Sequence, residues 1–72
     1  MRLHPKDIKV GDTFYECERG MNAKMVCESN PANDGDEWTF DATNEQGRSV
    51  NYFYKDSAEA YAPRLYDSPQ YA

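Results

Sequence analysis

The sequence predicts a mainly β fold: one antiparallel sheet of four or five strands, strongly bent or closed into a small barrel, with one short helix near the C-terminus. Three observations support this prediction. Aromatic residues make up 14% of the 72 residues, and aromatic side chains favour strands. Two stretches alternate apolar with polar residues, as half-buried strands do. Each stretch is divided by a glycine-containing break, as in a hairpin.

Length and composition limit the chain to a single domain over residues 1–72, whose ends at residues 1–7 and 67–72 are expected to fray. A domain of this size buries only about 60% of the surface that its unfolded chain exposes, so it has one small core. The N-terminal segment has no apolar signal-peptide region, and no apolar run is long enough to cross a membrane. The expectation is a cytoplasmic protein with no membrane contact.

The first hairpin is predicted from strand-forming residues at 13–19 and 23–29, which flank a break at Gly20-Met21-Asn22. Side chains alternate between the two faces of a strand, so a hairpin centred at Asn22 turns Phe14 and Val26 outward. The predicted pairs are Tyr15 with Ser29, Cys17 with Cys27, and Arg19 with Met25.

The second hairpin is predicted from the alternation in residues 36–42 and 50–54. Its connection, Asn44-Glu45-Gln46-Gly47, suits a three-residue loop with Gly47 in the left-handed conformation. Before this hairpin, residues 28–37 are rich in turn formers and are predicted to be an exposed acidic loop. The predicted pairs are Trp38 with Tyr54, Phe40 with Tyr52, and Ala42 with Val50.

The predicted core consists of inward residues from both hairpins: Tyr15, Met25, Cys27, Trp38, Phe40, Val50, Tyr52 and Tyr54. Phe53 is left on the outward face with Phe14 and Val26. These three side chains form a second apolar patch, unless the sheet curls and the C-terminal segment covers them.

The short helix is predicted near Ser57 to Ala62. Asp56 and Glu59 have the spacing of a capping box, and Pro63 ends the helix. Residues 64–66 can then form a last short strand.

No catalytic, cofactor or metal site is predicted, so the chain is not expected to be an enzyme. Catalysis needs several convergent groups with tuned pKa values, and the only histidine, His4, is expected to be solvated. The four glycines are isolated, so no phosphate-binding loop is present. Two cysteines and one distant histidine are too few for structural zinc. The acidic loop is a poor calcium site, because Ala32 stands at a ligand position and the flanks are strands.

Cys17 and Cys27 face each other in the predicted register. In a reducing cytoplasm they are expected to be free thiols that act as small hydrophobic side chains. A disulfide or a redox switch is the alternative.

The net charge of −5 is concentrated in one part of the chain. Residues 25–47 contain six acidic and no basic side chains, a distribution that repels nucleic acid and attracts basic partners. The plainer interpretation is that these carboxylates only keep a small domain soluble. The residues predicted to bind a partner are the acidic Asp34, Asp36, Glu37, Asp41 and Glu45 and the apolar Phe14, Val26 and Phe53.

The segment Ile8-Lys9-Val10-Gly11-Asp12-Thr13-Phe14 resembles the opening of many SH3-like small β-barrels, where it turns the chain into the first strand. With Tyr61-Ala62-Pro63-Arg64-Leu65-Tyr66 after a short helix, the whole pattern is similar to small uncharacterised proteins of bacteriophages and other mobile elements. The resemblance implies accessory proteins, some of which block host or defence machinery, including acidic inhibitors that imitate the charge of nucleic acid. It brings no catalytic motif.

The expected function is therefore that of a non-enzymatic, acidic protein-binding module without cofactors, which acts on a host or defence factor with a basic surface. If it is phage-encoded, it acts in the host cytoplasm. The alternative is a small-barrel protein that binds nucleic acid or a transcription or translation complex through Lys6, Lys9, Arg19 and Lys24. Direct nucleic-acid binding is disfavoured, because no basic groove accompanies the exposed aromatics. The sequence leaves open whether the chain forms a homodimer.

Overall fold

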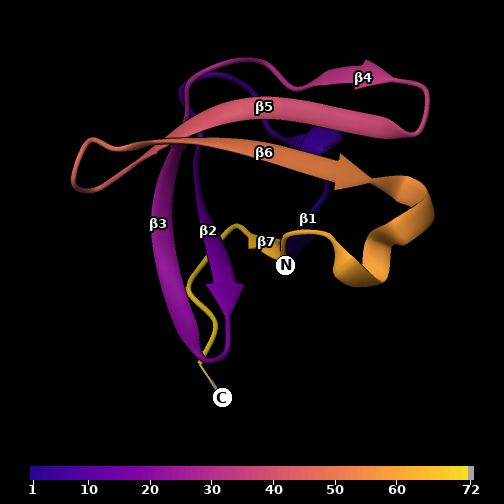
Figure 1. The fold of residues 1–72 in the computed structure, drawn as a ribbon. Helices are drawn as coiled ribbons and strands as arrows, with labels where there is room; N and C mark the ends of the chain where they lie inside the picture. The colour runs from indigo at the N-terminus through magenta and orange to yellow at the C-terminus, as the bar shows by residue number, and fades with distance from the viewer. Residues whose placement is uncertain (72) are drawn as a thin grey trace.

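Residues 1–71 are described by a computed structural model, shown in Figure 1. No helix within these residues is long and apolar enough to cross a membrane. The elements in chain order are β1 (Arg2–Leu3), η1 (Pro5–Asp7), β2 (Thr13–Glu18), β3 (Met21–Cys27), β4 (Ala32–Asp34), β5 (Glu37–Asn44), β6 (Ser49–Lys55), η2 (Asp56–Tyr61) and β7 (Leu65–Tyr66), where η denotes a 3-10 segment.

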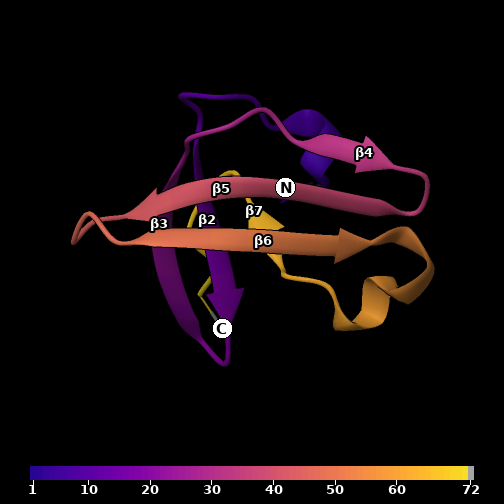
Figure 2. The same cartoon turned by 45° about the horizontal axis from the view of Figure 1, so that its top comes forward.

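All seven strands belong to one antiparallel sheet. β7 pairs with β1 and β2, and β2 continues through β3 to the C-terminal end of β5. The N-terminal end of β5 pairs with β4, and its other edge pairs with β6 over its whole length. Figures 1 and 2 show the long β5–β6 pair crossing the β2–β3 hairpin steeply, so the sheet is strongly bent. Within residues 1–71, β6 pairs only with β5, so the sheet is not closed.

The prediction of a mainly β fold built on one antiparallel sheet is confirmed. The number of strands is seven instead of four or five, because two short strands form where none was expected. β1 lies in the N-terminal segment, and β4 lies within the predicted acidic loop at residues 28–37. The side chains of β4 are exposed, as predicted for that loop.

The first hairpin is present, but its predicted register is wrong. Its two-residue turn is Arg19-Gly20, and both residues have positive φ (51° and 77°), as in the type I′ turns favoured in hairpins. Phe14 therefore pairs with Met25, and Cys17 with Asn22. The difference from the predicted register is an odd number of residues, which moves every β2 side chain to the other face. Phe14 is fully buried instead of outward.

The second hairpin agrees with its prediction in both register and turn. All three predicted pairs are present. Gly47 has φ +80°, and its N–H donates to the carbonyl of Asn44 at 3.0 Å. A glycine is favoured there because the left-handed conformation strains residues that carry a Cβ.

The core lies inside the bend of the sheet. Its centre is aromatic: Phe40 stacks on Tyr52 with ring centroids 5.0 Å apart, and Phe14 meets both edge-on at 5.8 and 5.7 Å. Trp38, Val50 and Tyr15 are only half-buried, although all were predicted core residues. The buried apolar residues are Ile8, Phe14, Met25, Cys27, Phe40, Ala42, Tyr52, Tyr54 and Leu65.

The predicted helix at Ser57 to Ala62 is not formed. Residues Asp56–Tyr61 make 3-10 turns interrupted by a non-helical Ala58, and the residue at the N-terminal cap is Lys55, with no side-chain capping bond. Hydrogen bonds to Asp36 hold the start of this segment in place. Asp36 accepts the backbone N–H of Ser57 on Oδ1 at 2.8 Å and the backbone N–H of Asp56 on its carbonyl at 3.0 Å.

Within the segments expected to fray, Met1, Asp67 and Gln70 make hydrogen bonds. The N-terminal ammonium lies 2.8 Å from the carboxylate of Asp67, and the side chain of Asn22 bonds to the backbone N–H and carbonyl of Gln70. Residue 72 lies outside the described residues.

The two cysteines are free thiols, but their predicted proximity is wrong. Cys17 donates to Asn22 Oδ1 and lies on the outer side of β2, whereas Cys27 is buried in the core and donates to the carbonyl of Ser29. Burial raises the pKa of the Cys27 thiol. The corrected register separates the two by about five residues along the hairpin, roughly 17 Å at strand spacing. That separation is too long for a disulfide.

Candidate functional site

The outward surface of the long hairpin and its neighbours gathers most of the predicted acidic site. Residues that face each other across antiparallel strands point to the same side. One row therefore runs from Ala32 through Thr39 to Phe53, and rows with carboxylates lie on both sides of it. We term this surface the acidic outer face. Its residues are Glu28, Ala32, Asp34, Glu37, Thr39, Asp41, Asn51, Phe53 and Lys55.

Phe53 is the apolar centre of the acidic outer face. Its side chain is 59% exposed, as predicted. It lies opposite Thr39, so its diagonal neighbours on β5 are Glu37 and Asp41, at distances that a phenyl ring can reach. Asp34 continues the row of Glu37, and Glu28 continues that of Asp41 through a backbone hydrogen bond of 2.8 Å.

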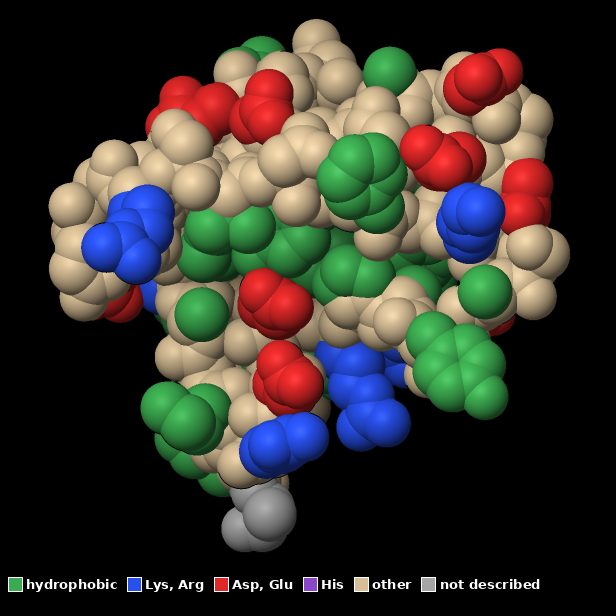
Figure 3. Space-filling model, viewed as in Figure 1, with side chains coloured by type: hydrophobic (Ala, Val, Ile, Leu, Met, Phe, Trp, Pro, Cys, Tyr) green, Lys and Arg blue, Asp and Glu red, His purple; other side chains and the backbone are tan. Residues whose placement is uncertain are grey.

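The carboxylates of this face lack salt bridges within residues 1–71: the Met1 ammonium pairs with Asp67, and the imidazole of His4 hydrogen-bonds to Asp56. Two of them accept neutral hydrogen bonds: Asp41 from the Asn51 amide at 2.8 Å, and Glu28 from the Thr43 hydroxyl at 2.7 Å. Lys55 is the one basic residue of this face and lies opposite Glu37, so the four carboxylates Glu28, Asp34, Glu37 and Asp41 leave the face with a net negative charge. Figure 3 shows acidic side chains along the side of the molecule formed by β4 and β5.

The remaining predicted site residues lie elsewhere or have another role. Val26 pairs with Thr43 at the end of the face and is 37% exposed. Phe14 is in the core, so it cannot join an exposed patch. Asp36 holds the start of η2, and Glu45 lies in the β5–β6 turn. Glu28 was not predicted as a site residue, although it follows Val26 with the outward spacing of a strand.

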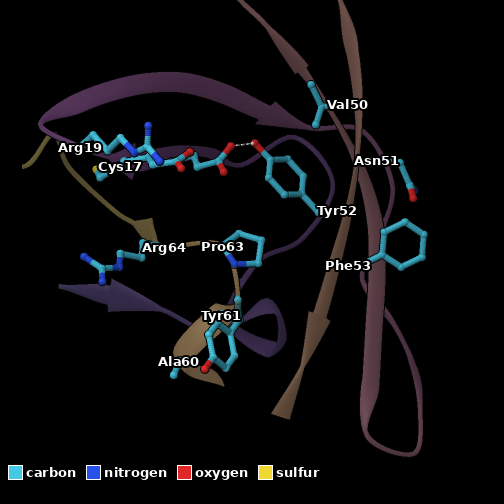
Figure 4. A pocket seen from close by; sticks show the side chains of 13 residues that line it. Cys17, Arg19, Val50, Asn51, Tyr52, Phe53, Ala60, Tyr61, Pro63 and Arg64 are labelled. Carbon is cyan, nitrogen blue, oxygen red and sulfur yellow. Dashed lines mark hydrogen bonds between the residues drawn. The ribbon is translucent and has the colours of Figure 1, made fainter. Parts of the chain in front are cut away.

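A groove lies on the other side of β6, along its free edge (Figure 4). It has a volume of about 780 Å³ and is lined by residues 16–19, 50–53 and 60–64. Inside it, the Tyr52 hydroxyl donates to Glu16 Oε1 at 2.7 Å, and burial together with this bond raises the pKa of Tyr52. The sequence did not indicate this groove, because the predicted β2 register turned the side chain of Glu16 outward.

His4 is half-buried, which contradicts the prediction that it is solvated. Its ring meets Trp38 and Tyr54 edge-on. Nδ1 accepts the backbone N–H of Lys6 at 3.0 Å, so the ring proton is on Nε2, which donates to Asp56 Oδ1 at 2.7 Å. That bond, with a second from the Trp38 indole, lowers the pKa of Asp56. Both imidazole nitrogens are occupied, so His4 ties the N-terminal segment to η2.

Two other predicted features do not converge on a site. Lys6 lies in η1, and Lys9 follows it, whereas Arg19 is at the far tip of the β2–β3 hairpin and Lys24 is on the outer side of β3. These four side chains do not form one groove. Among residues 1–71, no group of three His, Cys, Asp or Glu side chains is placed to hold a metal ion.

Comparisons with protein-family models, with curated proteins and with solved structures give no significant match.

Proposed function

We propose that this chain is a non-enzymatic protein-binding module that docks its acidic outer face onto a basic surface of a host or defence factor and inhibits or regulates it. One observation carries the proposal: an exposed phenyl ring, Phe53, lies at the centre of a strand surface that also presents four carboxylates without salt bridges within residues 1–71. An aromatic centre within a charged rim is the usual anatomy of a protein interface.

The physical roles of the two kinds of residue differ. The carboxylates Glu28, Asp34, Glu37 and Asp41 would accelerate encounter with a positive surface, and this effect weakens with salt. Phe53 would supply the buried area that keeps the complex together. Imitation of a nucleic acid by these carboxylates is one form of the proposal, and it requires that the partner also bind DNA or RNA at the same surface.

The strand order supports the further proposal that the fold is an open relative of SH3-like barrels. Strands β2, β3, β5 and β6 pair in that order, and β7, which follows the 3-10 segment η2, pairs with the first of them, β2. This arrangement is typical of SH3-like barrels. β1 and β4 are additions at the edges.

The experiment compares single variants in an affinity capture from host lysate, followed by quantification of each retained protein. Glu37→Gln lies on the acidic outer face, and Glu45→Gln is its matched control, since it removes the same charge from the β5–β6 turn. Phe53→Thr removes the ring but keeps a good strand former. Asp36 is left unchanged because it holds η2.

We expect the retention of one captured protein to depend on the acidic outer face and not on the net charge of the chain. Its retention should fall at least tenfold with Phe53→Thr and about two- to fivefold with Glu37→Gln, and it should stay unchanged with Glu45→Gln. Equal losses for Glu37→Gln and Glu45→Gln, or retention that does not depend on Phe53, would show that the acidic outer face is not a binding surface. In that case the carboxylates serve solubility.

A further inference from the structure

β6 carries backbone hydrogen-bonding groups that no strand of the described chain satisfies. In an antiparallel pair, residues that bond to the partner alternate with residues whose N–H and C=O groups point away. One backbone hydrogen bond at each end of the β5–β6 pair shows which residues of β6 bond to β5. The N–H of Asn44 donates to the carbonyl of Arg48, and the N–H of Asp56 donates to the carbonyl of Asp36, each at 3.0 Å.

Every second residue from Arg48 to Asp56 bonds to β5, and Tyr52 is one of these residues. Asn51 and Phe53 therefore point their N–H and C=O groups at the free edge. No hydrogen bond from either backbone N–H to another described residue is found outside the strand ladder, and β6 has no second strand partner within residues 1–71. Proteins normally cover or blunt such an edge, because it can pair with another chain.

The unpaired backbone of Asn51 and Phe53 borders the groove described above. Figure 4 shows the side chains of Asn51 and Phe53 directed away from the groove, whereas that of Tyr52 is directed into it. The two outward residues therefore line the groove with their backbone. Val50 and Pro63 are among the apolar residues that line it, and the space-filling view shows an apolar band at this place (Figure 3).

Within residues 1–71, a carboxylate inside the groove has no salt-bridge partner. Glu16 is half-buried, its Oε1 is bonded to the Tyr52 hydroxyl, and no ion pair within residues 1–71 includes it. Arg19 and Arg64 also line the groove, but both are exposed and neither lies within salt-bridge distance of Glu16. A partly desolvated carboxylate makes its strongest hydrogen bonds to a cation.

We propose that the free edge of β6 binds an extended peptide segment of a partner protein, which adds a strand to the sheet and inserts a Lys or Arg side chain toward Glu16. The backbone of the added strand bonds to Asn51 and Phe53. Its residue opposite Tyr52 points to the same side as Tyr52. A Lys or Arg there extends beside the tyrosine ring to the depth of its hydroxyl, where Glu16 lies. An apolar residue two positions away packs on Val50.

This inference concerns the backbone edge of Asn51 and Phe53 and the groove beside it, not the side chains of the acidic outer face, and it does not rest on the function proposed above. The probe is the capped peptide acetyl-Thr-Val-Thr-Lys-Thr-Val-Thr-amide, whose palindromic sequence presents the same side chains in either strand direction. The matched control peptide has Glu in place of Lys. Binding is followed by chemical shifts and amide hydrogen exchange of the isotope-labelled protein, with up to about 2 mM peptide, since one short added strand is expected to bind near 1 mM.

In the free protein, the amides of Asn51 and Phe53 should exchange faster than that of Tyr52. The Lys peptide should slow exchange at Asn51 and Phe53 at least threefold and leave Tyr52 unchanged, and the Glu peptide should bind at least tenfold more weakly. No saturable shift at the highest peptide concentration, or shifts centred on Thr39 and Asp41, would overturn the proposal.

Two protein variants separate the groove from general electrostatics. Glu16→Gln removes the charge but keeps an acceptor for the Tyr52 hydroxyl, and should weaken the Lys peptide about tenfold. Glu45→Gln makes the same change of net charge outside the groove and should leave the affinity within twofold. If the two variants weaken binding equally, Glu16 does not recognise the peptide and the proposal is wrong.

Discussion

Replacement of Phe14 by Ala tests the corrected register of the first hairpin. The ring is fully buried and lies edge-on against Phe40 and Tyr52, so Phe14→Ala should lower the free energy of unfolding by about 3 to 5 kcal/mol. A domain of 72 residues is expected to have a total stability of about 4 to 11 kcal/mol. The loss should therefore remove between about a quarter and the whole of this stability.

Urea denaturation followed by Trp38 fluorescence and far-ultraviolet circular dichroism measures this loss. Phe53→Thr is the control, because Phe53 is exposed and Thr is a good strand former, and it should cost less than about 1 kcal/mol. Phe14→Leu keeps most of the volume and should cost about 1 kcal/mol, so it remains measurable if Phe14→Ala is unfolded. If Phe14→Ala loses no more stability than Phe53→Thr, Phe14 is not in the core and the corrected register is wrong.

Two further predictions concern acid stability and thiol reactivity. Hydrogen bonds from His4 and Trp38 lower the pKa of Asp56 from 3.8, so its stabilising effect is present above that pH and is lost as the pH falls below it. Asp56→Asn should therefore flatten the fall in melting temperature below pH 4, and an unchanged acid profile would contradict this. A thiol reagent should label the half-buried Cys17 in the folded protein and label Cys27 only after unfolding, because Cys27 is buried with a raised pKa. Mild oxidation should form no bond between the two within one chain, and finding one would refute the corrected register.

The sequence predicted the β5–β6 hairpin correctly because two independent local signals agreed. The alternation around Trp38 and Tyr52 selects the faces, and Gly47 selects the turn. The turn specifies the register and the alternation agrees with it, so no contact from elsewhere in the chain is needed. For this reason the outward position of Phe53 and its carboxylate neighbours could be predicted.

The β2–β3 hairpin was mispredicted because its local signals conflict. Gly20 and Asn22 both suit a turn, and both alternating sets of β2 contain aromatic residues, Phe14 and Tyr15. The local pattern gives no reason to prefer either set for the core. The choice depends on the rings of Phe40 and Tyr52, which fill the interior beside Phe14 and come from a distant part of the chain. The buried position of Phe14, the separation of the cysteines and the position of Glu16 in the groove all follow from that choice.

Composition and alternation were enough to predict a small, mainly β domain with two antiparallel hairpins and an acidic middle third, since each depends on neighbouring residues alone. Only the tertiary structure decided how the chain ends and edges are arranged. β1 and β7 are two-residue strands that exist because each bonds to a partner far away in the sequence. The edge of β6 is free because no strand of residues 1–71 other than β5 pairs with it. Such short segments have too few residues to carry a period, and their free energy comes from hydrogen bonds and burial against distant strands.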